Sequence, residues 1–412
     1  MKYRKLSKRQ LLAMSWWRRP KYQDCEGIIC DGSIRSGKTI SMSVGFILWA
    51  MASFDRCDFA ICGKTIESLR RNVIKHLPEW LGGIVDIRER RIENLIIITS
   101  GNKENNFYLF GGKDEGSAAL IQGITLAGVL FDEVALMPRS FVEQAEGRCS
   151  VDGSKYWYNC NPESPKHWFY LERVKKAKEK GLLFLHFTMA DNFSLSDRIK
   201  KRYENQFVGV FYRRFILGEW CIADGLIYSN FDPAKHTVKP DVIPQQGEHY
   251  ISIDYGTLNP FSAGLWRVSN GRTYRIAEFY HDGRASNKML TDEEYYKEIE
   301  KLAGGRVIQC IVVDPSAASF IATIRRHGKY QVRKADNSVL DGIRVTAGYL
   351  QSGRLLISDV CTAAIREFGL YRWDEKQTSD KPVKESDHAM DEIRYFCMTI
   401  LRRRVALPKE DA

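Results

Sequence analysis

The chain has 412 residues, of which 44% are hydrophobic, 12% aromatic and 27% charged, and it exceeds the length that one hydrophobic core usually serves. This composition excludes a small single module, a disordered chain and a collagen-like repeat. Lysine and arginine (62) outnumber aspartate and glutamate (51), so the net charge of +11 favours a polyanionic partner, with a merely basic surface as the alternative.

The first half of the chain alternates short apolar runs with longer amphipathic ones. Strands are expected over 27–30, 58–62, 127–131, 155–158 and 182–187, with an antiparallel pair over 94–99 and 107–110. Helices are expected from Lys38 onward and over 66–77, 141–148 and 166–180. Strands that alternate with helices predict an α/β fold with a mostly parallel sheet covered on both faces.

A change of pattern at 229–247 predicts an inter-domain linker, because this stretch contains three prolines and no sustained periodicity. It would separate a domain over 1–228 from a domain over 248–412. In the second domain we expect strands over 251–254, 307–313, 331–334 and 355–358, a hairpin turning at 269–271, and helices over 293–302, 317–326, 339–350 and onward to Arg404.

A phosphate-binding motif lies between the first strand and the first helix. Residues 32–39 read GSIRSGKT and match G-x-x-x-x-G-K-[ST] in the context that the motif requires. Backbone N–H groups of such a loop converge on the phosphates, Lys38 supplies a positive charge, and Thr39 offers a hydroxyl to Mg²⁺. The expected ATP-binding residues of the loop are Gly32, Arg35, Ser36, Gly37, Lys38 and Thr39.

Two acidic residues end the apolar strand over 127–131. We expect Asp132 to hold Mg²⁺ through its hydration shell and Glu133 to polarise the attacking water. A strand that ends in a solvated acidic turn is the alternative. The upstream phosphate loop favours the catalytic interpretation.

Several polar residues are candidates to complete the ATP site. Asn161 follows the next strand, where P-loop enzymes place a sensor of the γ-phosphate, although an Asx-Pro turn explains it equally well. Arg35 lies inside the loop, and Arg139 and Arg148 flank the helix after Glu133. We include Arg148 in the expected site, in cis or across a subunit boundary. Each arginine is alternatively a solvated surface charge, so the choice among them stays open.

The second half of the chain carries a separate set of carboxylates. Asp254 and Asp314 each end an expected strand, and both emerge on the same side of the sheet if these strands pair in parallel. Asp387, His388 and Asp391 begin the C-terminal helix at spacings that bring side chains together. Convergence of Asp254, Asp314 and Asp391 would suit Mg²⁺ or Mn²⁺ and phosphodiester hydrolysis.

Supporting residues are expected around these three catalytic aspartates. His388 and Asp387 are the nearest in sequence to Asp391, and Glu278, on the second arm of the hairpin, is a further candidate. Each acid taken alone is more typical of a helix cap or a solvated strand end. Their combination with this order of strands and helices favours a site.

Cysteine usage and hydropathy exclude several other classes. The ten cysteines form no CxxC pair and have no histidine-rich partner cluster, which predicts neither a zinc site nor a disulfide framework but reduced thiols in a cytosolic protein. The basic N-terminus lacks the apolar core of a secretory signal, and the longest uncharged stretch, 41–54, is shorter than the roughly 18 residues of a membrane span.

The order of these motifs resembles the large terminase subunit of tailed bacteriophages, especially its PBSX-like branch. The resemblance rests on 33–39, on 131–133, on the Asn-Cys-Asn-Pro of 159–162, on Asp254 and Asp314, and on 387–391. It implies a P-loop (RecA/ASCE-like) ATPase domain followed by an RNase H-like nuclease domain. Such a motor hydrolyses ATP with Mg²⁺ to move double-stranded DNA into a procapsid, and cleaves that DNA.

The resemblance also implies partners and residue roles. A small terminase subunit, the portal protein and a homo-oligomeric ring on the portal are expected in the host cytoplasm, with no membrane. Asp254, Asp314 and Asp391 look like the metal-binding triad, with His388 in support. Gln10 resembles the upstream glutamine that recognises adenine, with a basic DNA-facing arm as the alternative.

Two other functions remain as alternatives. A repair or recombination ATPase–nuclease would explain both sites, but the arginine- and glutamine-rich motifs of a second helicase lobe are not visible after residue 230. A nucleotide-switched DNA-binding assembly factor would make the second set of carboxylates structural. Basic runs over 175–180, 198–202 and 402–404 favour phosphate contacts without sequence readout in each case.

Overall fold

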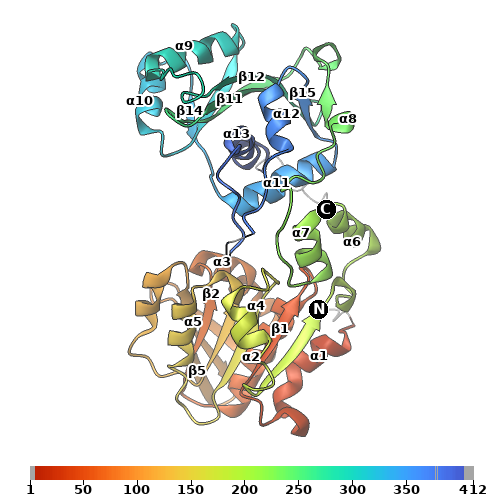
Figure 1. The fold of residues 1–412 in the computed structure, drawn as a ribbon. Helices are drawn as coiled ribbons and strands as arrows, with labels where there is room; N and C mark the ends of the chain where they lie inside the picture. The colour runs from red at the N-terminus through yellow and green to blue at the C-terminus, as the bar shows by residue number, and fades with distance from the viewer. Residues whose placement is uncertain (1–4, 376, 378, 403–412) are drawn as a thin grey trace. The chain divides into compact units, whose positions relative to one another are not determined.

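The computed structural model of the chain describes residues 5–375, 377 and 379–402 (Figure 1). Two compact units divide it. The first is formed by the residues up to 203 together with 212–222, and the second by 204–211 together with the residues from 223 onward. All ten cysteines are free thiols, as the sequence predicts. In the described ranges every helix is too short or too polar to cross a bilayer.

An eight-stranded sheet forms the centre of the first unit, in the order β3-β4-β5-β2-β6-β7-β1-β8. The strands are β1 (Gly27–Gly32), β2 (Asp58–Gly63), β3 (Asp86–Arg90), β4 (Leu95–Ser100), β5 (Lys103–Gly111), β6 (Gly128–Asp132), β7 (Lys155–Asn159) and β8 (Leu182–Phe187). From β5 to β8 all neighbours pair in parallel, which confirms the expected sheet. β3 and β4 add an antiparallel edge. β3 escaped the sequence analysis because its charged sequence DIRER shows no apolar alternation.

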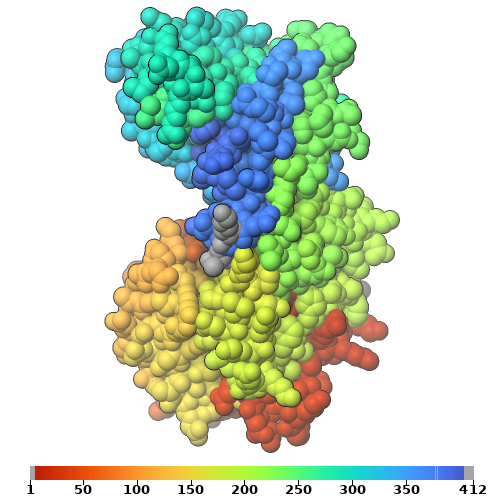
Figure 2. Space-filling view, in the orientation of Figure 1, coloured from red at the N-terminus to blue at the C-terminus, as the bar shows by residue number. Residues whose placement is uncertain are grey.

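The helices of the first unit include α1 (Lys8–Ser15), α2 (Lys38–Ser53), α3 (Ile66–Asn72), α4 (Leu77–Leu81) and α5 (Arg139–Glu146). α2, α3 and α5 begin at or close to their expected positions, whereas α1 was not predicted. α2 has no charged residue after Lys38 and is mostly buried, with Phe46 and Trp49 packing against Trp157. The segment that contains α1, drawn in red in Figure 2, lies on the surface of this unit.

Two expected helices of this unit differ from prediction. The helix over 66–77 ends at Asn72, and α4 starts after a 3-10 turn with Pro78 in its first turn, a position where the missing N–H costs little. The helix over 166–180 is reduced to a π-helical turn over Tyr170–Val174, followed by turns. Its lysine-rich second half offers few apolar side chains to bury. α6 (Asp197–Glu204) and α7 (Gly209–Tyr212) contain points at which the chain passes from one unit to the other.

A seven-stranded sheet forms the second unit, in the order β14-β13-β10-β11-β12-β15-β9. Its strands are β9 (Thr237–Val238), β10 (Glu248–Asp254), β11 (Phe261–Ser269), β12 (Arg272–His281), β13 (Ile308–Val313), β14 (Val332–Lys334) and β15 (Leu355–Ser358). β10, β11 and β12 are antiparallel neighbours, whereas β13 lies parallel to β10 and β14 parallel to β13. This is the arrangement expected of an RNase H-like nuclease.

Helices cover both faces of this second sheet. They are α8 (Pro233–His236), α9 (Asp292–Ala303), α10 (Ala318–His327), α11 (Val339–Gln351), α12 (Thr362–Phe368) and α13 (His388–Phe396). Ile251 and Ile253 of β10 share a core with α9 and α10. Ser252 hydrogen-bonds to Glu392 of α13, so it faces the opposite side. Because side chains alternate along a strand, Asp254 belongs to the α13 side as well.

The segment over 229–247, which the sequence predicts as an inter-domain linker, contains regular structure of the second unit. It contains α8 and β9, and β9 pairs in parallel with β15 of the second sheet. Pro233 and Pro240 each lie in the first turn of a short helical segment, so these prolines start local structure rather than interrupt it. The domain limits of 1–228 and 248–412 stay a prediction.

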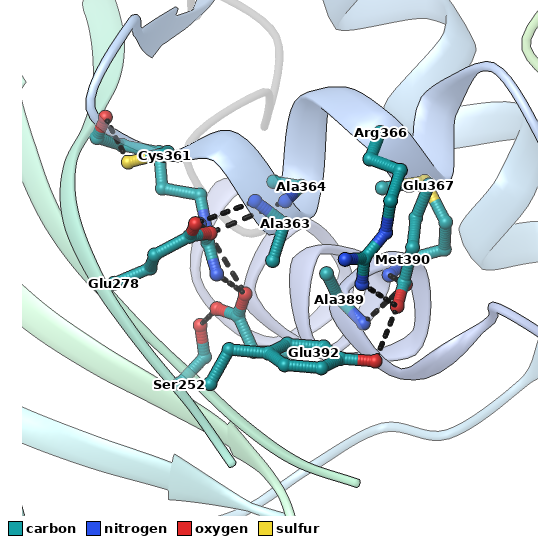
Figure 3. Close-up of polar contacts among 12 residues, drawn as sticks. Ser252, Glu278, Cys361, Ala363, Ala364, Arg366, Glu367, Ala389, Met390 and Glu392 are labelled. Atoms are coloured by element: carbon teal, nitrogen blue, oxygen red, sulfur yellow. Dashed lines mark hydrogen bonds and ion pairs between the residues drawn. The ribbon is translucent and has the colours of Figure 1, made fainter. Parts of the chain in front are cut away.

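A buried ionic network fixes α13 against the sheet (Figure 3). Arg275 and Glu392 have fully buried side chains, and the guanidinium donates from Nη2 (2.9 Å) and Nε (3.1 Å) to Oε2 of Glu392. Ser252 and Trp266 donate to its other oxygen. A Cβ at Gly264 would lie 2.6 Å from Glu392 and 2.7 Å from Arg275, so only glycine fits there.

We expect Arg275→Ala to destabilise the second unit by about 3–5 kcal/mol, because Glu392 would keep a buried charge without its cation. Chemical unfolding measures this change. The matched control is Arg326→Ala, which breaks an exposed pair with Glu293 and should cost less than about 1 kcal/mol. Equal effects of the two substitutions would contradict the assignment.

Candidate nucleotide and nuclease sites

Lys38 lies at the centre of the loop that follows β1. Its side chain is buried, and its ammonium donates to the carbonyl oxygens of Gly32 (3.0 Å) and Ser33 (2.6 Å) and to Oδ1 of Asn161 (3.1 Å). Burial lowers the pKa of Lys38 to about 8. The loop therefore holds a desolvated positive charge at the point where the sequence predicts phosphates.

The backbone of this loop is hydrogen-bonded to two other segments of the first unit. Ser33 N–H donates to the carbonyl of Phe187 in β8 (2.9 Å), and Ile34 N–H donates to that of Phe215 (2.9 Å). Gly32 has a φ of 122°, and a Cβ there would lie 1.9 Å from the Phe187 oxygen. The main-chain N–H groups of Ser33 and Ile34 thus hold the loop in place.

Thr39, Asp132 and Asn159 meet at the carboxyl ends of β6 and β7. The Asn159 amide donates to Asp132 Oδ1 (2.6 Å) and to Thr39 Oγ1 (3.0 Å), and the Thr39 hydroxyl lies 3.4 Å from the same carboxylate oxygen. Burial raises the pKa of Asp132, against the effect of these hydrogen bonds. A hydroxyl beside a carboxylate is a donor set that fits a Mg²⁺ ion with water ligands.

A cavity of about 600 Å³ opens beside these residues. Glu133, which has a φ of 61°, lines it together with Arg35, Ser36, Gly37, Lys38, Thr39, Asp132 and Asn161. All of them were expected at an ATP site.

One wall of this cavity was not predicted from the sequence. That wall consists of Arg71, Asn72, His76 and Trp80, from α3, α4 and the turn between them. His76 and Trp80 stack with ring centroids 5.4 Å apart. These residues match no motif. Their position after β2, whose carboxyl end lies on the same sheet edge as the loop, is the only signal that points to them.

Arg148 does not reach the ATP site of its own chain. α5 leads away from the carboxyl end of β6, and the Arg148 carbonyl accepts from the N–H of Leu126, which precedes β6 at the opposite edge of the sheet (2.8 Å). A helix that connects parallel strands must run back across the sheet, so α5 carries Arg148 away from the loop of its own chain, and a role for Arg148 in ATP hydrolysis stays a prediction. Arg139 forms ion pairs with Glu143 and Glu172.

Gln10 contacts the loop from the N-terminal side. Its Oε1 accepts from Ser7 N–H (2.9 Å) in the capping box of α1. A Cβ added to Gly37 would lie 2.1 Å from its Nε2, so the two residues are in close contact. The position is compatible with the expected role of Gln10 next to a bound base.

The second group of residues lies where β10 and β13 end side by side. These strands are parallel, as the sequence argument required, so Asp254 and Asp314 emerge at the same edge. Asp254 Oδ2 lies 3.0 Å from Nδ1 of His388, the first residue of α13. Burial raises the pKa of Asp254 to about 6, although the contact with His388 opposes the shift.

Tyr395 of α13 hydrogen-bonds to Asp314 and lies within electrostatic range of Asp254 and Asp391. Its hydroxyl donates to Asp314 Oδ2 (2.7 Å), while Ser316 N–H donates to Oδ1 (2.7 Å). Burial favours the neutral acid, but these hydrogen bonds hold the pKa of Asp314 below its ordinary value. Burial and the nearby charges of Asp254 and Asp391 raise the pKa of Tyr395, so both of these carboxylates act on the same phenol.

Asp387 and Asp391 already have cationic partners. Arg394 donates to Asp391 Oδ1 (2.9 Å), and the ammonium of Lys384 lies 3.2 Å from Asp387 Oδ2 and 3.3 Å from Asp391 Oδ2. The carboxylate chemistry fits Mg²⁺ or Mn²⁺. In the part of the chain that the structure describes, however, no three acidic, histidine or cysteine side chains stand together as a ready metal site.

Glu278 is not part of this group, which corrects the prediction. It accepts from the N–H groups of Ala363 (2.7 Å) and Ala364 (3.2 Å) at the start of α12, and pairs with Arg275 (Figure 3). A carboxylate at a helix N-terminus satisfies unpaired N–H groups. Its role is therefore structural, and the hairpin position alone did not reveal it.

Comparison with known proteins gives the family. Residues 29–234, half of the chain, match the family model "Terminase large subunit, T4likevirus-type, N-terminal". The chain is 50% identical to the large terminase of a thermophilic bacteriophage, covering 97% of this chain and 100% of that one with a TM-score of 0.92. The chain belongs to the phage large terminase family. The ADP complex of the same thermophilic phage terminase is 50% identical, with 96% and 99% coverage and a TM-score of 0.88.

The ATP-gamma-S complex of the thermophilic phage terminase is 49% identical, with 96% and 100% coverage and a TM-score of 0.88. No curated protein matches this terminase. The predicted fold class and the predicted function, a DNA-packaging enzyme with ATPase and nuclease parts, are confirmed at the level of the family. Membership of the PBSX-like branch stays a prediction.

The stability of the terminase should depend on pH through Asp254. Its pKa of about 6 lies above the value of 3.8 for an unfolded aspartate, so stability falls as pH rises through this window. The asparagine side chain of the Asp254→Asn variant cannot ionise. We expect it to stabilise the second unit by about 1–3 kcal/mol above pH 7 and to lose this advantage below about pH 4.

Unfolding midpoints at several pH values measure this effect. Asp359→Asn, which removes an exposed carboxylate of the same unit, controls for the loss of one negative charge. A less stable Asp254→Asn protein at pH 8 would show that the carboxylate is held by its partners rather than strained by burial.

Proposed function

We propose that this terminase hydrolyses ATP at the loop after β1 and cleaves double-stranded DNA at the aspartates around Tyr395. The observation that carries the proposal is the presence of two separate polar sites, each at the carboxyl ends of parallel strands and each in its own unit. A binding module or a nucleotide switch would need only the first.

In the ATPase part, Lys38 and the loop N–H groups would bind the phosphates. Thr39 and Asp132 would hold Mg²⁺, which neutralises charge on the phosphates when bound. Glu133 would orient and activate the attacking water from the cavity wall, and Asn161, bonded to Lys38, would sense the γ-phosphate. The ADP and ATP-gamma-S complexes of the thermophilic phage terminase support adenine nucleotides as the ligands of this chain.

In the nuclease part, Asp254, Asp314 and Asp391 would hold Mg²⁺ or Mn²⁺. When bound, such ions activate water and stabilise the leaving oxygen of a phosphodiester. His388 would orient Asp254, and Tyr395 would orient Asp314 through the hydrogen bonds described above. Asp387 would support the same group beside Asp391.

The partners that fit this function are those of a packaging motor. The exposed side chains of Arg198, Lys201 and Arg202 on α6 suit the phosphates of double-stranded DNA. We propose a small terminase subunit and a portal protein as further partners, a homo-oligomeric ring as the working form, and the host cytoplasm, transiently the procapsid portal, as the location.

The two activities should separate by mutation. Lys38→Ala removes the positive charge that faces the phosphates, so we expect it to lower DNA-stimulated ATP turnover by at least about 100-fold. Mn²⁺-dependent plasmid nicking should stay intact. Asp254→Ala should do the reverse. Phosphate release and agarose gels measure the two activities.

Lys64→Ala is the control for Lys38, since Lys64 donates to backbone carbonyls outside the expected phosphate loop. Loss of both activities in both folded variants would refute independent sites. A wild-type chain that leaves the plasmid intact with Mn²⁺ would favour the assembly factor.

We expect Arg148 to act at the ATP site of a neighbouring subunit. Its position at the amino ends of the strands supports a role at the ATP site of another subunit rather than of its own chain. We expect Arg148→Ala and Lys38→Ala to be inactive alone, and an equimolar mixture to recover up to about a quarter of the ATPase rate. Only a mixed interface supplies both an intact loop and an intact arginine.

Subunit mixing at increasing protein concentration measures this recovery. A mixture of Lys38→Ala with Glu133→Gln is the control, because both changes affect the same side of the interface. Full activity of Arg148→Ala alone would remove this arginine from the ATP site.

A further inference from the structure

Lys384 places a positive charge between two carboxylates of the nuclease site. Its ammonium lies 3.2 Å from Asp387 Oδ2 and 3.3 Å from Asp391 Oδ2. Ser386, between Lys384 and Asp387, has a φ of 52°, a conformation that non-glycine residues seldom adopt. This bend lets the segment before α13 turn back over the first turn of the helix.

The three side chains differ strongly in exposure. The side chains of Asp387 and Asp391 are 6% and 9% exposed, whereas that of Lys384 is 70% exposed. The other oxygen of Asp391 is bound by Arg394, which is 2% exposed and also donates to the Asn337 carbonyl. Asp391 thus has one buried, fixed cation and one exposed cation on a flexible stem.

The Lys384 ammonium contacts the carboxylate oxygens to which a metal ion would bind. A divalent ion bonds directly to carboxylate oxygen, at about 2.0–2.1 Å for Mg²⁺, and an ammonium within 3.3 Å of the same two oxygens occupies that space. Arg394 is buried, so its departure would leave the buried carboxylate of Asp391 without its fixed cation. Lys384, in contrast, can swing into solvent by rotating its side chain.

We propose that Lys384 is a tethered counter-cation that must leave Asp387 and Asp391 before a divalent ion binds, and that it thereby sets the metal affinity of the nuclease site. This inference rests on the proposed metal-dependent nuclease. A lysine with a purely structural role would affect stability but not metal affinity.

The test measures Mn²⁺ binding to the full chain without nucleotide, by electron paramagnetic resonance of the free ion. Lys384→Ala and Lys384→Gln should bind the nuclease-site Mn²⁺ about three- to tenfold more tightly than the wild type, the range expected for loss of a partly exposed ion pair. Lys384→Arg, which keeps the charge, should resemble the wild type. Without metal, Lys384→Ala should have a lower Tm, and Mn²⁺ should raise that Tm more than it raises the Tm of the wild type.

Lys381→Ala is the matched control, because Lys381 is an exposed lysine of the same segment. Asp391→Asn identifies the site, since its Mn²⁺ binding should be lost. If Asp391→Asn loses binding while Lys384→Ala and Lys384→Gln bind equally or more weakly than the wild type, the inference is overturned and the nuclease proposal survives. If Asp391→Asn binds like the wild type, the metal site itself is wrong.

Discussion

Charge that is gathered at the ends of parallel strands must be balanced within the protein, and this constraint governs both sites. In the first unit the desolvated ammonium of Lys38 is held by two carbonyls and an amide oxygen. In the second unit Asp254 faces His388, and Asp391 faces Arg394. Burial shifts the pKa of Lys38 downward and that of Asp254 upward, because it disfavours the charged form of each side chain. A bound ligand of opposite charge would stabilise that charged form.

The structural and the functional carboxylates of the second unit differ in the groups that they contact. Glu367 is fully buried and accepts from Ala389 N–H (2.7 Å), Met390 N–H (3.4 Å) and the Tyr280 hydroxyl (2.8 Å), which anchors the first turn of α13 (Figure 3). Glu392 is anchored by Arg275 further along the helix. These fixed contacts hold α13 in place, so that Asp391 on the same helix can keep an exchangeable partner without losing its position.

The sequence predicted most strands and the two polar groups because strand ends follow directly from buried apolar runs. The prediction that Asp254 and Asp314 lie at the same edge of the sheet depended only on the parallel arrangement of β10 and β13. Glu278 was misassigned because a metal ligand and a helix cap have the same side chain, and only the position of α12 distinguishes them. The cavity wall around Trp80 was missed because it comes from a helix broken at Asn72, whose path depends on packing rather than on a motif.

The phosphate loop is coupled through the backbone to the residues that lead out of the first unit. Ile34 at its apex is bonded to Phe215, and a Cβ at Gly218 would lie 2.8 Å from the Ser33 nitrogen. The buried carboxylate of Asp31, just before the loop, accepts from Trp220 Nε1 (2.7 Å). Residues 212–222 belong to the first unit, and residue 223 begins the remainder of the second. A movement of the loop must therefore either break these bonds or move residues 212–222, which are joined at both ends to residues of the second unit.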